Sequence, residues 1–228
     1  MITIKKHYSY YNPQDGKYYV DKPYSLRDNK VSPSASPKIP LKNTADRAYK
    51  IPVFLSHPSM LNTTQTRFLN RLIDEIERAL LFPRTLPDTE QYPNKTITSV
   101  RRMILSSYGL IAVNMQQVFA NYTMTNIPGG TPPPPSWEGA PFLQIEPSMG
   151  YQRGLPLLLI KESGVNSIGV WNPSVVPFFI IEWDSSKPLD EFFNRVEWRE
   201  IFQNWVAQVR NGYFIQTQPS YRYGPDDL

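Results

Sequence analysis

The stretch that decides the fold runs from Lys50 to Leu80 and reads KIPVFLSHPSMLNTTQTRFLNRLIDEIERAL. Its first seven residues form a short apolar run typical of a buried strand, and a polar loop follows. Apolar side chains then recur at spacings of three and four, which predicts an amphipathic helix with Thr63 or Thr64 as its N-cap. These side chains are Phe68, Leu69, Leu72, Ile73, Ile76 and Leu80. A strand, a loop and a helix in this order make the first half of a βαβ unit.

The rest of the chain continues this alternation. Residues 81–87 predict a second strand, 98–107 a short helix, and 108–115 a third strand. Two uninterrupted apolar runs, 155–162 and 175–184, are typical of strands in a parallel sheet covered on both faces. The chain is therefore predicted to be an α/β protein, a Rossmann- or flavodoxin-like three-layer domain with a mostly parallel sheet.

Accessory segments are expected at both ends. HYSYYNPQDGKYYV, at 7–20, places two aromatic runs around a turn sequence and predicts a β-hairpin arm, which a Ser/Pro-rich linker follows. One apolar stripe through 185–212 predicts a single C-terminal amphipathic helix. The stripe consists of Leu189, Phe192, Phe193, Val196, Ile201, Phe202, Trp205, Val206 and Val209. The predicted divisions are an arm and linker at 1–49, an α/β core at 50–184, and a helix and tail at 185–228 that pack on the core.

A long interruption, ANYTMTNIPGGTPPPPSWEGAP, occupies residues 120–141. Its glycines and four consecutive prolines predict an absence of regular structure. Long loops of this kind in compact domains are usually functional, so we expect an active-site or interface loop.

Composition and charge exclude several classes of protein. The 228 residues contain no cysteine, which rules out disulfides, thiolate chemistry and cysteine-based zinc sites. No run approaches the roughly 18 apolar residues that cross a bilayer, and the N-terminus does not resemble a secretory signal, so we expect a cytoplasmic protein without a membrane segment. Residues 1–50 hold ten Lys or Arg against four Asp, whereas the remainder holds fourteen against sixteen acidic residues. Because no nucleic-acid motif accompanies the basic, Tyr-rich arm, nucleic acid is not the expected partner.

The predicted topology indicates where chemistry would occur, since ligands of parallel sheets bind at the carboxyl ends of the strands. Ser56 and His57 follow the first strand and Asn114 the third, and the long loop that carries Trp137 leads to Glu146. No phosphate-binding P-loop, G-x-G-x-x-G turn or G-x-S-x-G nucleophile elbow is present. With only two histidines in the chain, no His-rich metal cluster is expected.

One motif is more specific. Glu146, Ser148, Gly150 and Gly154-Leu155-Pro156 stand ahead of an apolar strand. This spacing resembles the signature of the nucleoside 2-deoxyribosyltransferase family, in which a catalytic glutamate precedes two small residues and Gly-Lys-Pro. Leu155 stands where that family has lysine. VFLSH, at 53–57, resembles the first strand of bacterial TIR domains, a related α/β fold whose glutamate cleaves the nicotinamide–ribose bond of NAD. The resemblance spans roughly residues 50–182.

The resemblance implies an enzyme that breaks an N-glycosidic bond, with NAD as the favoured substrate and no cofactor. The implied products are nicotinamide and either ADP-ribose or a cyclic ADP-ribose. A role in antiphage defence is implied in the same way. The chemistry is consistent with a glutamate, because cleavage builds positive charge on the sugar that a carboxylate can attack or stabilise. A position at a helix start would favour the anion of Glu146. The small residues Ser148 and Gly150 would let the sugar approach the backbone, and Trp137 would cover the base. Ser56, His57 and Asn114 would hydrogen-bond ribose or phosphate.

Two alternatives stay open. Within the enzyme class, the substrate could be a free nucleoside or nucleotide that the protein hydrolyses or transfers. Outside it, the chain would be a non-catalytic TIR-like module that assembles as a homo-oligomer or with a partner protein through its arm and its proline loop.

Overall fold

The structure, a computed structural model, describes residues 9–12, 17–20, 50–86, 89, 91–92, 96–177 and 179–215. The chain separates into two compact units, Met1–Ala35 and Ser36–Leu228. In the first, β1 (Ser9–Asn12) pairs antiparallel with β2 (Lys17–Val20), as the aromatic runs predict. The Ser/Pro-rich linker and the C-terminal tail lie outside the described residues.

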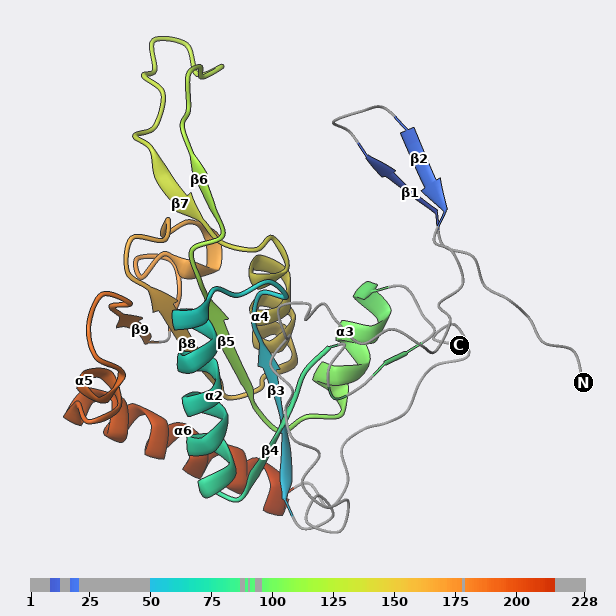
Figure 1. The fold of residues 1–228 in the computed structure, drawn as a ribbon. Coiled ribbons are helices and arrows are strands. Elements are labelled where there is room, and N and C mark those ends of the chain that lie inside the picture. The colour runs from blue at the N-terminus through green and yellow to red at the C-terminus, as the bar shows by residue number, and fades with distance from the viewer. Residues whose placement is uncertain are drawn as a thin grey trace, which may run out of the picture. The chain divides into compact units, whose positions relative to one another are not determined.

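A parallel five-stranded sheet forms the centre of the second unit (Figure 1). Its strands are β3 (Ile51–Ser56), β4 (Leu81–Arg84), β5 (Leu110–Asn114), β8 (Leu157–Glu162) and β9 (Ile180–Trp183). Their order across the sheet is β4-β3-β5-β8-β9, and every neighbouring pair is parallel. Numbered along the chain the order is 2-1-3-4-5, the flavodoxin-like arrangement. The predicted α/β class and parallel sheet are confirmed.

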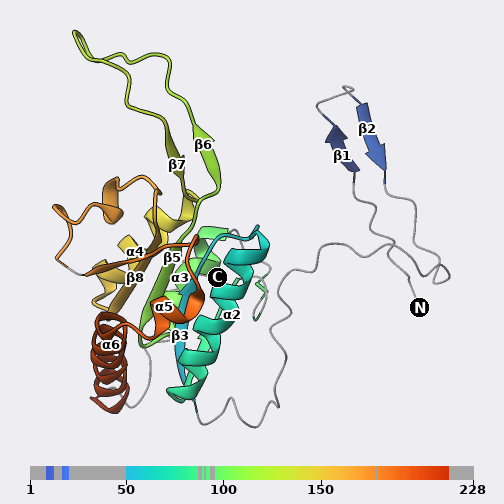
Figure 2. The ribbon, with the colours of Figure 1, turned by 60° about the vertical axis from the view of Figure 1, so that its left-hand side comes forward.

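Helices cover both faces of this sheet and bury two separate apolar clusters (Figures 1 and 2). On one face lie α2 (Thr63–Arg78), α5 (Leu189–Phe193) and α6 (Val196–Ile215). On the other lie α3 (Thr96–Leu105) and α4 (Phe142–Arg153). The result is the three-layer architecture that strands buried on both faces require.

Helix α2 carries the predicted apolar stripe, but it begins with a different cap. Asn62 is the N-cap: its Oδ1 accepts from the Gln65 backbone N–H at 2.9 Å, and the Gln65 side chain accepts in return from the Asn62 N–H. This reciprocal capping box satisfies two backbone donors. The N-cap is therefore Asn62, one residue before Thr63 and two before Thr64, so the predicted N-cap is wrong. On the core side, the Phe68 ring stacks on Trp183 with centroids 4.0 Å apart.

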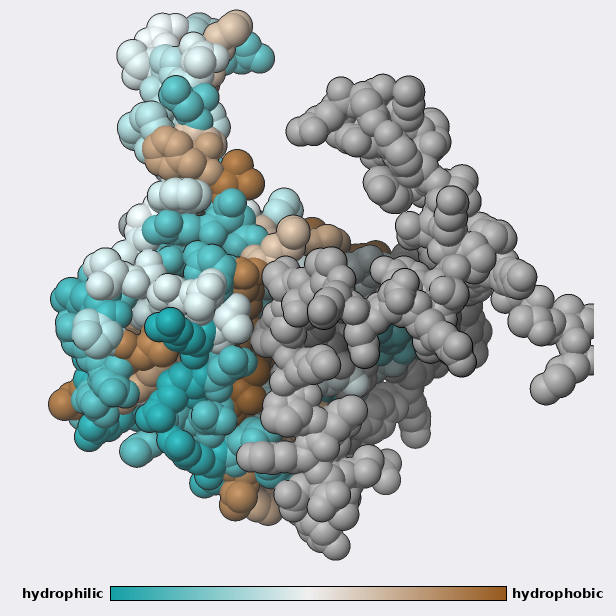
Figure 3. Space-filling model, in the orientation of Figure 1, coloured by the Kyte–Doolittle hydropathy of each residue, from teal (hydrophilic) through white to brown (hydrophobic). Residues whose placement is uncertain are grey.

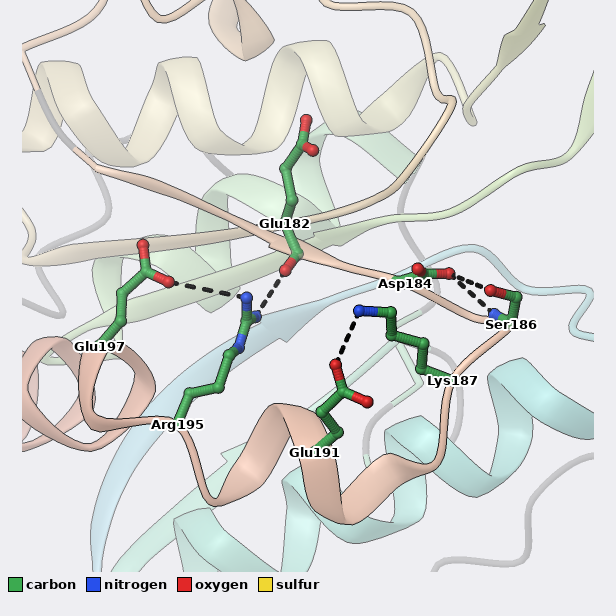
Figure 4. Close-up of polar contacts among 7 residues, drawn as sticks. All are labelled: Glu182, Asp184, Ser186, Lys187, Glu191, Arg195 and Glu197. Carbon is green, nitrogen blue, oxygen red and sulfur yellow. Dashed lines mark hydrogen bonds and ion pairs between the residues drawn. The ribbon is translucent and has the colours of Figure 1, made fainter.

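The predicted single C-terminal helix is two helices, which is a correction. Helix α5 ends at Phe193, and α6 starts at Val196. In the break, the Arg195 guanidinium donates to the Glu182 carbonyl oxygen at 2.6 Å (Figure 4). The break changes the phase of the helical repeat. As a result Trp198, outside the predicted stripe, is 2% exposed, whereas Val196, inside it, is 67% exposed.

The long interruption is also partly regular. Its ends form an antiparallel hairpin in which β6 (Val118–Ala120) pairs with β7 (Ser136–Glu138). The expectation of a structureless loop over 120–141 is therefore wrong at Ala120 and at Ser136–Glu138. Strand pairing joins residues that are far apart in sequence, so the local Gly and Pro content does not reveal it.

None of the helices in the described part of the chain combines the length and the apolar character needed to cross a bilayer.

Candidate functional site

The candidate site lies where the sheet order reverses, between β3 and β5. These strands are hydrogen-bonded neighbours in which Ser56 pairs with Ala112, so Ser56 and Asn114 end at the same edge of the sheet. In open α/β sheets ligands bind at this switch point, beyond the carboxyl ends of the strands. The helix that carries Glu146, α4, lies over the face formed in part by β5 and β8.

Helix α4 is held close to the sheet by a glycine and by the loop between β8 and β9. A Cβ on Gly150 would lie 2.9 Å from Leu110 Cδ1 and 3.1 Å from Leu157 Cδ2, so glycine allows this approach without a shift of either leucine side chain. Gly150 thus packs against the sheet and does not admit a sugar, which corrects the expectation from the motif. On its other flank, the indole N–H of buried Trp171 donates to the Leu143 carbonyl oxygen at 2.9 Å and fixes the first turn of α4.

The structure brings Glu146 and Ser56 together although ninety positions separate them. The Ser56 hydroxyl donates to Glu146 Oε2. Burial raises the pKa of Glu146 from 4.5 to about 7, and the hydrogen bond from Ser56 opposes the rise. Glu146 lies in the second turn of α4, so the expected stabilisation of its anion at a helix start is wrong. Removal from water is the larger effect and favours the neutral carboxyl group.

Glu146 faces a cavity of about 500 Å³. That size lies within the usual range of small-molecule sites, about 300–1,000 Å³. The residues that line the cavity are His57, Pro58, Ser59, Leu86, Gln91, Tyr92, Thr96, Ser99, Val100, Ala140, Phe142, Leu143 and Glu146. Among these residues Glu146 is the one carboxylate, and none is Lys or Arg. The described lining thus combines apolar side chains, neutral polar side chains and one half-buried acid.

Among the residues predicted to form the site, His57 also lies in the described lining of this cavity, together with Glu146. Its imidazole Nδ1–H donates to the Pro58 carbonyl oxygen at 2.9 Å, since a carbonyl can only accept. This bond assigns the proton to Nδ1 and holds the ring at the start of the loop that follows β3.

Most of the described lining was not predicted, including the polar residues Tyr92, Thr96 and Ser99. Tyr92 lies after β4, and its hydroxyl accepts from Arg84 at 3.2 Å. Thr96 and Ser99 belong to the first turn of α3. The rule that ligands bind at the carboxyl ends of parallel strands led to Ser56, and it also applies to these residues. Strand β4 is the neighbour of β3, so the carboxyl ends of both strands lie at the same edge of the sheet.

Asn114 and Trp137 lie apart from the described lining. Asn114 is 3% exposed, and its Oδ1 has no hydrogen-bond partner among the described residues. A Cβ on Gly139 would overlap this oxygen, so Gly139 covers it. Trp137 lies on β7, where it packs edge-on against Phe119 with centroids 5.3 Å apart. Their proposed contacts with a sugar and a base stay predictions.

Ser148 is exposed, and its hydroxyl donates to the Gln144 carbonyl oxygen at 2.6 Å within α4. It does not line the described cavity. Its predicted role in admitting a substrate remains a prediction.

A fully buried carboxylate also stabilises this edge of the sheet. Glu162, at the end of β8, is 2% exposed. Its Oε2 accepts from the Gln65 side-chain amide at 2.8 Å and from the Gln116 backbone N–H at 2.9 Å. These bonds tie the start of α2 to the end of β8 and to the segment that follows β5, so Glu162 Oε2 has a structural role.

No protein-family model matches the sequence, and no curated protein matches it either. Among the described residues, no group of three or more His, Asp or Glu side chains is arranged to hold a metal ion.

Proposed function

We propose that the protein cleaves the N-glycosidic bond of a nucleotide, or transfers the sugar moiety from its base to another acceptor. Glu146 is the carboxylate that acts on the sugar, and NAD is the favoured substrate. The observation that carries this proposal is the position of Glu146 on the wall of a cavity at the switch point of the sheet, with the Ser56 hydroxyl bound to it. The resemblance of its motif to deoxyribosyltransferases and of residues 53–57 to TIR domains supports the same reaction class.

The chemistry of bond cleavage fits a glutamate in this environment. As the bond between base and sugar breaks, positive charge develops on the sugar, and an adjacent carboxylate can attack it or stabilise it. Both the ionised and the protonated form of Glu146 are populated near neutral pH, because its pKa is about 7. A positively charged nicotinamide ring in the cavity would favour the anion and so activate the group as substrate binds. Nicotinamide leaves as a neutral molecule and needs no proton.

A free nucleoside is the second candidate, and one observation favours it. The described lining has no Lys or Arg that would neutralise a diphosphate. A neutral nucleoside avoids that requirement. Its base generally leaves with help from a proton, and the protonated form of Glu146, populated because burial raises its pKa, can donate one.

The dependence of kcat/KM on pH separates these two roles. If Glu146 acts as the anion, kcat/KM rises as pH passes through about 7; if it acts as an acid, kcat/KM falls over the same interval. The sign of this slope therefore shows whether Glu146 acts in its ionised or in its protonated form.

The deciding experiment is an assay of base release with the full chain, supplied with NAD and with a panel of nucleosides. Glu146→Gln removes the ionisable group and should lower the rate by at least about a hundredfold, the lower end of what a positioned acid or base contributes. Glu200→Gln is the matched control, because it makes the same chemical change at an exposed position of α6. Absence of base release from every substrate at high protein concentration, or equal rates for Glu146→Gln and wild type, would refute the proposal and favour the non-catalytic assembly module.

A further inference from the structure

The hairpin that leads into α4 forms a distinct feature, which we call the proline arm, residues 118–138. From Val118 to Trp137 it contains no Asp, Glu, Lys or Arg. Figures 1 and 2 both show it extending away from the sheet and its helices. An uncharged segment of this length on a protein surface calls for a physical explanation, because exposed protein surface is normally rich in charge.

The base of the proline arm is held in place by hydrogen bonds. Glu138 accepts from the Tyr122 hydroxyl at 2.7 Å, from Ser136 Oγ at 2.9 Å and from the Asn166 side-chain amide at 3.0 Å. Burial alone would raise the pKa of Glu138, but these three donors lower it. The carboxylate stays ionised and continues to accept all three bonds at neutral pH.

Beyond this base, the arm exposes apolar side chains and prolines. Phe119 is 56% exposed, Met124 81% and Ile127 71%. Every residue from Thr131 to Pro135 is exposed, and none lies in a helix or strand. Figure 3 shows the arm standing out from the surface of the domain. Phe119, at the base of the arm, also contacts Trp137, but its exposed area and that of Met124 and Ile127 are not covered by the described part of the chain.

The four prolines restrict their own backbone. Each pyrrolidine ring holds φ near −65°, and each proline biases the residue before it toward an extended conformation. A run of four therefore favours the polyproline II helix, which repeats every three residues and would span about 12 Å over Pro132–Pro135. In that helix Pro132 and Pro135 lie on the same edge. Little conformational entropy is lost when such a segment binds, because it is already ordered.

We propose that the proline arm is the docking segment for a partner protein that recognises a polyproline II helix in an aromatic-lined groove. Such grooves bind Pro-x-x-Pro edges, and the pair Pro132 and Pro135 supplies one. The neighbouring apolar side chains of the arm add contact area at the rim. Absence of charge disfavours phosphate-rich partners such as nucleic acid, which bind chiefly through Lys and Arg.

The test uses the full chain and a purified WW domain as the probe, because its groove is lined by Tyr and Trp. The chemical shifts of the isotopically labelled WW domain are followed as the protein is added. We expect saturable binding at the aromatic groove, weakened at least about tenfold by the double variant Pro132→Ala/Pro135→Ala. The matched control is Thr123→Ala/Asn126→Ala, on the other leg of the arm, which should bind as wild type does.

Three results would overturn the proposal. The first is an absence of shift changes at the groove up to millimolar protein. The second is binding that survives the proline substitutions, because the probe would then recognise another segment such as Pro33–Pro40. The third is a concentration-dependent dimer in light scattering that the proline variant abolishes, which would assign the arm to a second copy of this chain. Glu146→Gln should leave WW binding unchanged, so the outcome is independent of the proposed catalysis.

Discussion

Replacing Glu146 by glutamine tests what it costs the fold to keep this carboxyl group buried. Burial raises the pKa of Glu146 from 4.5 to about 7, so the native state holds the proton more tightly than the unfolded chain does. Between these values the free energy of unfolding falls as pH rises, because ionisation favours the unfolded chain. The stabilisation is complete below pH 4.5 and is lost as pH rises through about 7. Glutamine has no such titration, and its amide oxygen can still accept from Ser56.

The magnitude follows from the two pKa values. Each tenfold change in proton affinity corresponds to about 1.4 kcal/mol, so wild type loses about 3 kcal/mol over the whole interval. About 2.5 kcal/mol of this loss falls between pH 5 and pH 8. The stability of Glu146→Gln relative to wild type should therefore rise by about 2.5 kcal/mol between pH 5 and pH 8, whatever its value at pH 5.

Urea denaturation followed by circular dichroism at both pH values measures this difference, and carbon NMR of the Glu146 carboxyl group measures its pKa directly. Glu200→Gln, exposed on α6, corrects for the general effect of removing a carboxylate. A stability difference between wild type and Glu146→Gln that stays constant from pH 5 to pH 8, or an NMR midpoint near 4.5, would show that the carboxyl group is hydrated and the reasoning wrong.

Three further predictions concern the same edge of the sheet. Ser56→Ala removes the donor that lowers the pKa of Glu146, so the midpoint of the kcat/KM profile should move to higher pH; an unchanged midpoint would contradict the hydrogen bond. Gly139→Ala forces a methyl group onto Asn114 Oδ1 and should destabilise by about 1–3 kcal/mol in urea denaturation, a loss that Asn114→Ala in the same chain should partly reverse. Glu162→Ala leaves two amide donors without their acceptor and should cost about 1–3 kcal/mol, again measured in urea; a neutral effect would mean that water replaces the carboxylate.

Some of the site was predictable from the sequence. The carboxyl ends of β3 and β5 were expected to meet, and Ser56 and His57 were selected for that reason. The apolar run after Pro156 predicts the strand β8, but Glu146 was expected at the start of a helix that in fact begins at Phe142. Prediction failed where the role of a residue depends on a surface formed elsewhere in the chain. Gly150 allows α4 to pack closely on Leu110. The residues next to it in sequence do not distinguish that role from contact with a ligand.

The elements of the sheet were determined by the sequence itself. Runs such as VFL at 53–55 and LLLI at 157–160 are apolar on both faces, and the stripe on α2 is apolar on one, so burial of these patterns is enough to define a parallel sheet between two helical layers. Only the tertiary structure decided how the site behaves. The pKa of Glu146, its bond to Ser56, the cover that Gly139 places over Asn114 and the break before α6 all arise from groups distant in sequence. Desolvation and hydrogen bonding depend on those neighbours in space, and no local pattern encodes them.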